Sequence, residues 1–469
     1  MAPRHQGRDV RPQTVIGVFA GTPLLSLLAL RAPVLTFVAA GVASVGIAAI
    51  TSPSGFMTGA AFLSSAVPKA GVVVGGLPLP VMMFVLMVTA VMLRGRTRRE
   101  RNPGRRLALM AILWLIFRMV ALYLNGGTLA NVAALAGWYG LPVLLLLVGP
   151  ALGSLPLTIG KKWISGLENG ILLACSFSLV QQFLGLERTA LPGITRAVGV
   201  DYSTKPLAFE GGSKIPSTYQ NGNILGAVTA MFFLVATDHV LRGRATRRDK
   251  FLMGATAVAT ILSGSRTAVI GLGLGLAILM VRAGLRRKTL AIVAGCVLVV
   301  GLTLQLSPAL SRRLTGTSAS DPALNVRTDI WSAVLDQTSV LDFLVGGSAW
   351  AYPLEPPGLA EGMIGAVQQV GIIGMTLFVV VFWTATSPPH LRRWRLYLIP
   401  IGISLAVDSA YLVFPTLFLP IARMFGLIDR FEVPPAEDQG LEGMSVPNLE
   451  TTPPLRRSTI SAWSGQSPG

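Results

Sequence analysis

Four charged residues stand where they could take part in chemistry. Arg266 lies in LSGSRTAVIG, between two apolar runs, and a guanidinium group near the edge of a hydrocarbon layer is usually paired or functional. Arg327 lies in NVRTDIWSAVLD, four residues before Trp331, and a helix that presents both can bind an anionic or sugar-bearing lipid. Glu361, in GLAEGMIG, could act as a general base toward a sugar hydroxyl. Asp408 lies inside an apolar stretch, which makes it a functional candidate.

Three amides stand close together in TYQNGNILGAV: Gln220, Asn221 and Asn223. An amide side chain both donates and accepts hydrogen bonds, so this group could bind sugar hydroxyls. The alternative is a structural role, because asparagine is a favoured residue at the start of a helix.

Each charged candidate also has a simpler interpretation. Arg266 could extend toward lipid headgroups, and Arg327 could be a solvated side chain beside Asp329. Glu361 could favour a helix N-terminus through the macrodipole. Asp408 could pair with an arginine in the membrane. Position and spacing leave both interpretations open for all four.

The elements that must position these residues are membrane-spanning helices. Of 469 residues, 52% are hydrophobic and 13% are charged, against about 25% charged in a typical soluble domain. Apolar runs recur that are long enough to cross a hydrocarbon core about 30 Å thick. We therefore predict an all-α, polytopic membrane protein with about 11 to 14 spans, and exclude soluble enzymes, coiled coils and outer-membrane barrels. The clearest spans are 15–31, 33–50, 78–93, 107–124, 131–152, 164–185, 222–241, 250–263, 267–282, 289–306 and 363–384, with a broken stretch at 396–428.

The orientation follows from basic clusters between the spans. Five segments hold 21 Lys and Arg residues and two acids: 94–106, 161–162, 242–250, 282–288 and 392–395. Stepping through the spans places all five on one side, which the positive-inside rule makes the cytoplasm. The same rule explains the net charge of +18 better than nucleic-acid binding does. The topology of residues 1–93 is not fixed by this pattern.

The regions outside the spans divide into loops and a tail. Two long external loops are predicted at 187–220 and 307–362, and loops of such length are usually functional or disordered. Region 52–77 is apolar but rich in Gly, Ser and Pro. Three interpretations of this region stay open: a loop, a re-entrant segment or a poor membrane span. We predict one transmembrane domain over 1–428 and a disordered cytoplasmic tail over 429–469, because the tail cannot bury a core.

Several kinds of chemistry lack the residues they need. In this topology His239 and His390 are cytoplasmic, and the basic residues Arg4, Arg8 and Arg11 favour the same side for His5, so no histidine base is expected outside. No phosphate-binding loop of the GxxxxGK[ST] type and no HExxH helix occurs, and the one GxSxG string, GQSPG at 465–469, lies in the predicted disordered tail rather than between a strand and a helix. Cys175 and Cys296 lie in apolar segments, which predicts neither a disulfide nor a metal site. The glycine-rich run GLGLGLAI (271–278) lies in a span and is better explained by close helix packing.

Four pieces, taken in order, resemble the O-antigen polymerase and ligase superfamily. They are YQNGNILG at the start of a span, SGSRTA between two spans, VRTDIWSAVLDQTSVLDFLVGG in a long outer loop, and QQVGIIG (368–374) at the start of the next span. The similar region covers about 219–384. Ligases of the superfamily typically carry a His-Asn motif at the loop exit, where this chain has Ala360-Glu361-Gly362, which resembles the Glu-containing pattern of the polymerase branch. The chain also has Gly222 where the family often has proline.

The resemblance implies a metal-independent, inverting membrane glycosyltransferase that uses no cofactor. Its substrate would be a polyprenyl-pyrophosphate-linked glycan, elongated into a surface polysaccharide on the outer face of the plasma membrane, with a chain-length regulator as a candidate partner. Arg266 and Arg327 would clamp the leaving pyrophosphate. Glu361 would serve as base or acceptor-orienting group, and Gln220, Asn221, Asn223, Trp331 and Asp408 would bind substrate.

Three other functions stay open, of which a shape-and-elongation membrane synthase of the cell wall is the weakest rival. Ligase-type transfer of a preformed glycan to a second acceptor belongs to the same superfamily. A transporter or flippase of lipid-linked sugars would also be polytopic, but such proteins usually show repeats and discontinuous spans, and no convincing repeat is seen here.

Overall fold

The computed structural model describes residues 52–68, 71–74, 77–80, 104–128, 157–191, 214–284, 287–306, 338–347, 362–385 and 393–407, with isolated residues between these ranges. Predictions for spans 15–31 and 33–50, most of 78–93 and 131–152, and the tail lie outside the described residues. The elements are α3 (Pro53–Ala66), β1 (Gly71–Val74), β2 (Leu77–Pro80), α5 (Gly104–Leu124), α8 (Leu157–Leu184), η2 (Ser217–Tyr219), α9 (Gly222–Leu241), α10 (Arg247–Leu262), α11 (Arg266–Ala283), α12 (Arg287–Leu306), α15 (Val340–Val345), α16 (Gly362–Ala385), η4 (Arg393–Leu396) and α18 (Ile399–Val407).

The described chain is a helical multi-pass membrane protein. Six of its helices are long and apolar enough to cross a bilayer: α5, α8, α9, α11, α12 and α16. All six were predicted as spans from the sequence. Helix α10 also occupies a predicted span, 250–263, but with 16 residues it is shorter than the other six.

Region 52–77 begins with a helix and runs into a hairpin. Helix α3 has 14 residues, and β1 pairs antiparallel with β2 from Gly71 opposite Pro80 to Val74 opposite Leu77. The all-α prediction did not include this hairpin. Proline lacks a backbone N–H, so it suits a strand with a free edge, and the sheet has only these two strands among the described residues.

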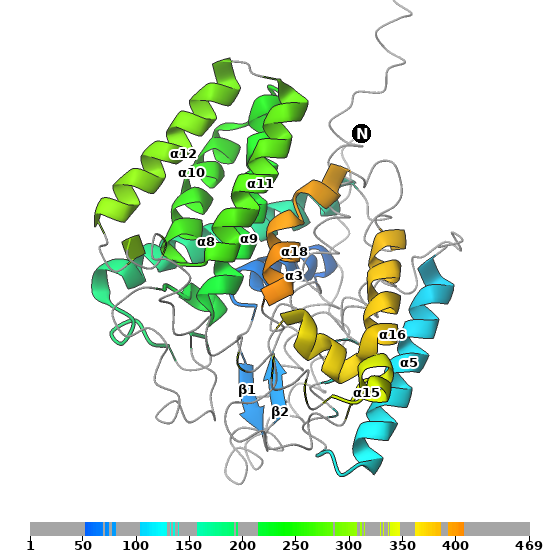
Figure 1. Ribbon diagram of the computed structural model, residues 1–469. Helices are drawn as coiled ribbons and strands as arrows, with labels where there is room; N and C mark the ends of the chain where they lie inside the picture. The colour runs from blue at the N-terminus through cyan, green and yellow to red at the C-terminus, as the bar shows by residue number, and fades with distance from the viewer. Residues whose placement is uncertain are drawn as a thin grey trace, which may run out of the picture.

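Helix α9 lies at the centre of the larger group of helices. Its span window is 89% buried, whereas the windows of the other five helices are 17–44% buried. It packs against α10, α11, α12 and α18, as Figure 1 shows for α10 and α11. Because α9 is apolar on every face, it can be covered by neighbours on every side.

Small residues allow the closest helix contacts. A Cβ atom added at Gly271 would lie 2.5 Å from Cα of Pro400 on α18, and one at Gly275 would lie 2.5 Å from Leu234 on α9. The glycine-rich run in α11 is thus a packing surface, as predicted. Gly166 and Gly170 have the same role where α8 crosses α3.

A second group consists of α5, α15 and α16 (Figure 1). Its core includes Leu115 and Leu122 of α5 and Val370 and Phe378 of α16. Helix α16 also contacts α18, which links the two groups.

Candidate functional site

The chain approaches α9 through a strained turn. Ser217 and Gln220, with φ of 52° and 56°, are the two non-glycine residues with positive φ in the described part of the chain. Such conformations are uncommon for L-residues and concentrate at functional sites. Buried contacts hold them here: the Ser217 N–H donates to Oε1 of Gln181 at 2.7 Å, and its hydroxyl donates to the carbonyl of Ala174 at 2.7 Å.

The residues between these two positions are fixed to α3. The hydroxyl of Tyr219 donates to the carbonyl of Ser65 at 2.7 Å, and the hydroxyl of Thr218 donates to the carbonyl of Ala66. The hydroxyl of Ser65 in turn donates to the carbonyl of Leu167 on α8 at 2.7 Å. Helix α3 therefore acts as a support that sets the position of the start of α9.

The predicted amide group begins α9. Asn221 is the N-cap residue, and its Oδ1 accepts from the backbone N–H of Asn223 at 2.8 Å. Nε2 of Gln220 donates to the carbonyl of Ile194 at 2.9 Å, so it ties α9 to residues that follow α8. The capping role that the sequence left open for Asn221 is confirmed.

The segment SGSR forms a tight turn from α10 into α11. Ser263 caps the end of α10, Gly264 has φ of +62°, and Ser265 is the N-cap residue of α11. The hydroxyl of Ser265 accepts from the backbone N–H of Ala268 at 3.3 Å, and Ser263 and Ser265 are almost fully buried. Arg266 is the first residue of α11 and is half-buried.

The two motifs lie directly against each other. A Cβ atom at Gly222 would come within 2.5 Å of the carbonyl oxygen of Ser263. One at Gly226 would overlap the hydroxyl of Ser263 and lie 3.1 Å from Cβ of Ser265. A hydrogen bond of 2.8 Å between the hydroxyls of Thr229 and Thr260 continues the contact along α9 and α10. Glycine at position 222 is what permits this approach.

We call this contact between residues 217–226 and 262–268 the α9–α11 junction. Helices α9 and α11 begin there and α10 ends there at Ser263, so the positive ends of two macrodipoles and the negative end of one lie beside the guanidinium-bearing Arg266. Helix N-termini favour anions such as phosphate. The junction thus has a positive balance, from Arg266 and two helix N-termini against one helix C-terminus, with amide side chains at its edge.

The structure brings together four of the eight predicted site residues: Gln220, Asn221, Asn223 and Arg266. The other four, Arg327, Trp331, Glu361 and Asp408, lie outside the described residues.

Sequence reasoning missed a second polar feature, a break in α16. Gly371 has φ of 71° and ψ of 170°, which interrupts the helix. The three carbonyl groups before the break are satisfied from outside α16. The carbonyl of Gln368 accepts from the backbone N–H of Gly347 at 2.8 Å. The carbonyl of Gln369 accepts from Nε of Arg118 at 3.2 Å, and that of Val370 accepts from Nε1 of Trp114 at 2.9 Å.

The same break brings the VGG and QQVG motifs together. A Cβ atom at Gly371 would lie 2.6 Å from the backbone nitrogen of Gly346. The side-chain amide of Gln369 is buried and has no hydrogen-bond partner among the described residues. The signal for this site was Arg118 itself, a charged residue inside a predicted span.

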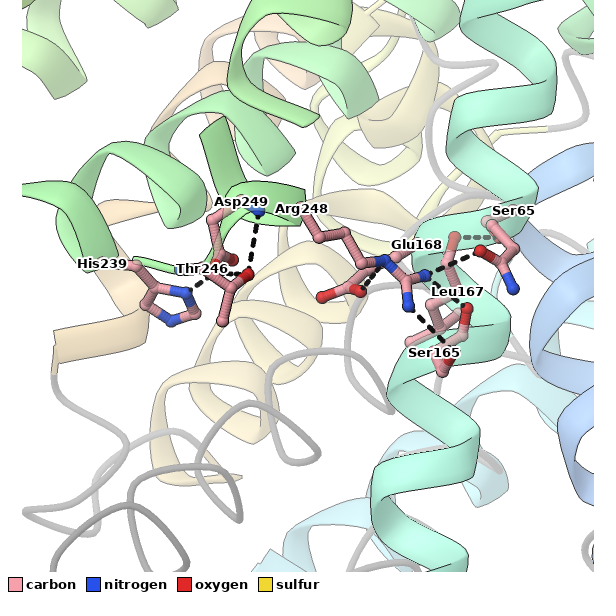
Figure 2. Close-up of polar contacts among 9 residues, drawn as sticks. Ser65, Ser165, Leu167, Glu168, His239, Thr246, Arg248 and Asp249 are labelled. Carbon is pink, nitrogen blue, oxygen red and sulfur yellow. Dashed lines mark hydrogen bonds and ion pairs between the residues drawn. The ribbon is translucent and has the colours of Figure 1, made fainter. Parts of the chain in front are cut away.

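A third polar cluster lies at the opposite end of α9, beside the basic loop. Nε of Arg248 pairs with Glu168 at 2.9 Å, and its Nη2 donates to Oδ1 of Asn169 at 2.7 Å, so α10 is fastened to α8 (Figure 2). Asp249 contacts Nδ1 of His239 at 3.0 Å and closes a capping box with Thr246.

The electrostatics of Asp249, which precedes the predicted span 250–263, follow from these contacts. Burial acts to raise its pKa, but hydrogen bonds from His239 and Thr246 outweigh burial and lower the pKa to about 2. The carboxylate is therefore charged at physiological pH and has a structural role. In the described part of the chain, no three His, Cys, Asp or Glu side chains are grouped as metal ligands would be.

Three of the five basic clusters gather at this one end. Lys161 and Lys162 precede the α8 residues that Arg248 binds, and Nζ of Lys288 would lie 3.8 Å from a Cβ atom at Gly243. The grouping of 161–162, 242–250 and 282–288 agrees with the sequence prediction that these segments lie on the same side of the membrane.

Comparison with protein-family models, with curated proteins and with solved structures finds no match to this chain.

Proposed function

We propose that the chain is an integral-membrane glycosyltransferase that polymerises polyprenyl-pyrophosphate-linked repeat units on the outer face of the plasma membrane. The observation that carries the proposal is the α9–α11 junction. Two of the four motifs that resemble the polymerase and ligase superfamily, YQNGNILG and SGSRTA, meet there in three dimensions. The other two, around Gly346 and Gln369, meet at the break in α16.

The chemistry of the junction suits a departing pyrophosphate. As the glycosidic bond to the pyrophosphate breaks, negative charge grows on the leaving oxygen. Arg266 and two converging helix N-termini would stabilise that charge without rearrangement. Gln220 and Asn223 would orient sugar hydroxyls at its edge. Arg327 and Glu361 keep the roles that the resemblance implies, as second clamp and as base or acceptor-orienting group.

Product length tests the proposal. Purified full-length protein, given lipid-linked repeat units, should produce a ladder of lengthening lipid-linked glycans without ATP and in the presence of EDTA. Cleavage of the bond between the sugar and the pyrophosphate supplies the free energy, so ATP should not be needed. EDTA should not inhibit the reaction, because Arg266 rather than a metal ion would bind the leaving pyrophosphate. A single transfer of preformed polymer to a second acceptor would identify a ligase and overturn the polymerase assignment.

One observation favours a second candidate, a transporter of lipid-linked sugars. Transporters place substrates at discontinuous helices near the middle of the membrane, and α16 is interrupted at Gly371 beside buried amides. Such a protein in sealed vesicles would move lipid-linked sugar between leaflets and form no new glycosidic bond. Movement of lipid-linked sugar between leaflets without a ladder of lengthening glycans would favour the transporter over the polymerase.

A further inference from the structure

An apolar groove lies between α9, α10 and α12, away from the α9–α11 junction and from the break in α16. Its volume is about 350 Å³. Apolar side chains and glycines make up nearly all of its wall, and a lysine stands among them. Residues from the three helices that line it include Val240, Met253, Gly254, Lys288, Gly295 and Cys296.

Two glycines on neighbouring helices leave this groove empty. A Cβ atom at Gly254 of α10 or at Gly295 of α12 would meet nothing within 4 Å. They differ from Gly226 and Gly271, where a neighbouring helix fills the space. Glycine inside a helix is less favourable than alanine by about 1 kcal/mol, and no close packing explains it at Gly254 and Gly295. Both α9 and α12 are long and apolar enough to span the membrane, so the groove between them would be in contact with lipid acyl chains.

A cation stands at one end of the groove. Lys288 lines it, is exposed, and makes no ion pair within the part of the chain that the structure describes. Its Nζ lies beside Gly243, in the turn that connects α9 to α10. Two neighbouring basic residues are paired within the protein, Arg242 with Asp238 at 2.7 Å and Arg248 with Glu168 at 2.9 Å. Lys288 is therefore placed to receive an anion.

We propose that this groove binds one acyl chain of an anionic phospholipid, with the lipid phosphate against Lys288. The polyprenyl carrier is a poorer fit. The groove reaches Val240, whereas the α9–α11 junction begins at Gly222, about 27 Å away along the helix. A pyrophosphate held at the junction cannot also contact Lys288. The bound lipid would fasten α12 to α9 and α10, whatever reaction the protein carries out.

Native mass spectrometry of the delipidated full-length protein tests this. We expect it to retain one phosphatidylglycerol in preference to a phosphatidylcholine with the same chains. Gly295→Leu, which fills the groove, should abolish retention. Gly301→Leu is the matched control, since position 301 of the same helix is also open but lies outside the groove. Lys288→Gln should lower the preference for phosphatidylglycerol about fivefold, whereas Arg282→Gln should not.

A second measurement uses Cys296, which lines the groove in the unaltered protein. Phosphatidylglycerol should slow alkylation of Cys296 by N-ethylmaleimide, read on the peptide that contains it. Three results would overturn the proposal: equal retention by wild type and Gly295→Leu, unchanged alkylation of Cys296, or displacement of phosphatidylglycerol by undecaprenyl phosphate at equal concentration. The last would make the groove a carrier site.

Discussion

The guanidinium group of Arg118 joins two carbonyl groups that lie far along the chain, those of Gly347 at 2.8 Å and Gln369 at 3.2 Å. The second is one of the carbonyls released by the break at Gly371. Irregular backbone inside a membrane needs such partners, because lipid supplies none. Arg118 is thus one of the three donors, with Trp114 and the backbone N–H of Gly347, that make the break in α16 tolerable.

This relationship predicts a loss of stability on truncation. Arg118→Met leaves two buried carbonyls without a partner, which should lower the free energy of unfolding by about 3 kcal/mol. The apparent Tm of the detergent-solubilised protein measures the effect, and Arg118→Lys should keep part of it. The exposed Arg188 offers a control, since Arg188→Met should melt like wild type. Equal Tm values for Arg118→Met and wild type would show that the break is held by other contacts.

The α9–α11 junction predicts a sharp difference between two glycines. Gly226→Ala places a methyl group onto Ser263 and Ser265, so it should separate α9 from the SGSR turn and reduce glycan polymerisation at least tenfold. Gly273→Ala, on α11, meets open space and should leave activity unchanged. Rates should be compared at equal protein levels. Full activity in Gly226→Ala would mean that the contact between the motifs does not matter for the reaction.

The depressed pKa of Asp249 predicts how stability depends on pH. A carboxyl group with a folded pKa of about 2 and an ordinary value of 3.8 contributes stability that is fully present above about pH 4–5. That contribution is lost as pH falls toward 2. Asp249→Asn should therefore destabilise the protein by about 2 kcal/mol at neutral pH and progressively less in acid.

Thermal melts of wild type and Asp249→Asn between pH 7 and pH 2.5 measure this difference. Asp336→Asn, at an exposed position, serves as the control and should follow wild type throughout. A gap between wild type and Asp249→Asn that stays constant with pH would show that the carboxylate's charge is not what stabilises α10.

The grouping of basic clusters at one end predicts opposite labelling of two positions. With Cys175 and Cys296 replaced by alanine, a single cysteine at Glu187, beyond the far end of α8, should react with a membrane-impermeant thiol reagent in intact cells. One at Ala245, in the basic loop, should react only after lysis. Labelling of Ala245→Cys in sealed cells would reverse the orientation and place Arg266 in the cytoplasm.

Sequence pattern predicted the spanning helices well where an apolar run has clear ends. The bounds predicted for α9, 222–241, match the structure, because Asn221 caps one end and basic residues follow the other. The hairpin at 71–80 was missed because GVVVGGLPLP is apolar throughout, and its prolines weigh against strands.

The candidate site was likewise predictable only in part from the sequence. The alternation of basic and non-basic segments along the chain placed Gln220 and Arg266 at the same end of the bundle. The contact of Gly222 with Ser263 depends on how the helices pack, so it could not be predicted from residue spacing. The break at Gly371 was missed because glycine is common in spanning helices, and only the donors on α5 and in the 338–347 segment make it stable. Arg118 could have been found, since a charge within a span is unusual.

The rate of glycan ladder formation by Arg266→Lys, relative to wild type, tests the central claim most directly. An arginine meets a phosphate with two parallel hydrogen bonds, and lysine cannot reproduce that geometry. Losing a transition-state contact of this kind costs about 3 kcal/mol, so polymerisation should fall on the order of a hundredfold at normal protein levels. Arg282→Lys, in the last turn of the same helix, should polymerise like wild type. Wild-type ladder formation by Arg266→Lys would contradict the account and leave Arg266 as an interfacial side chain that serves only to reach the lipid headgroups.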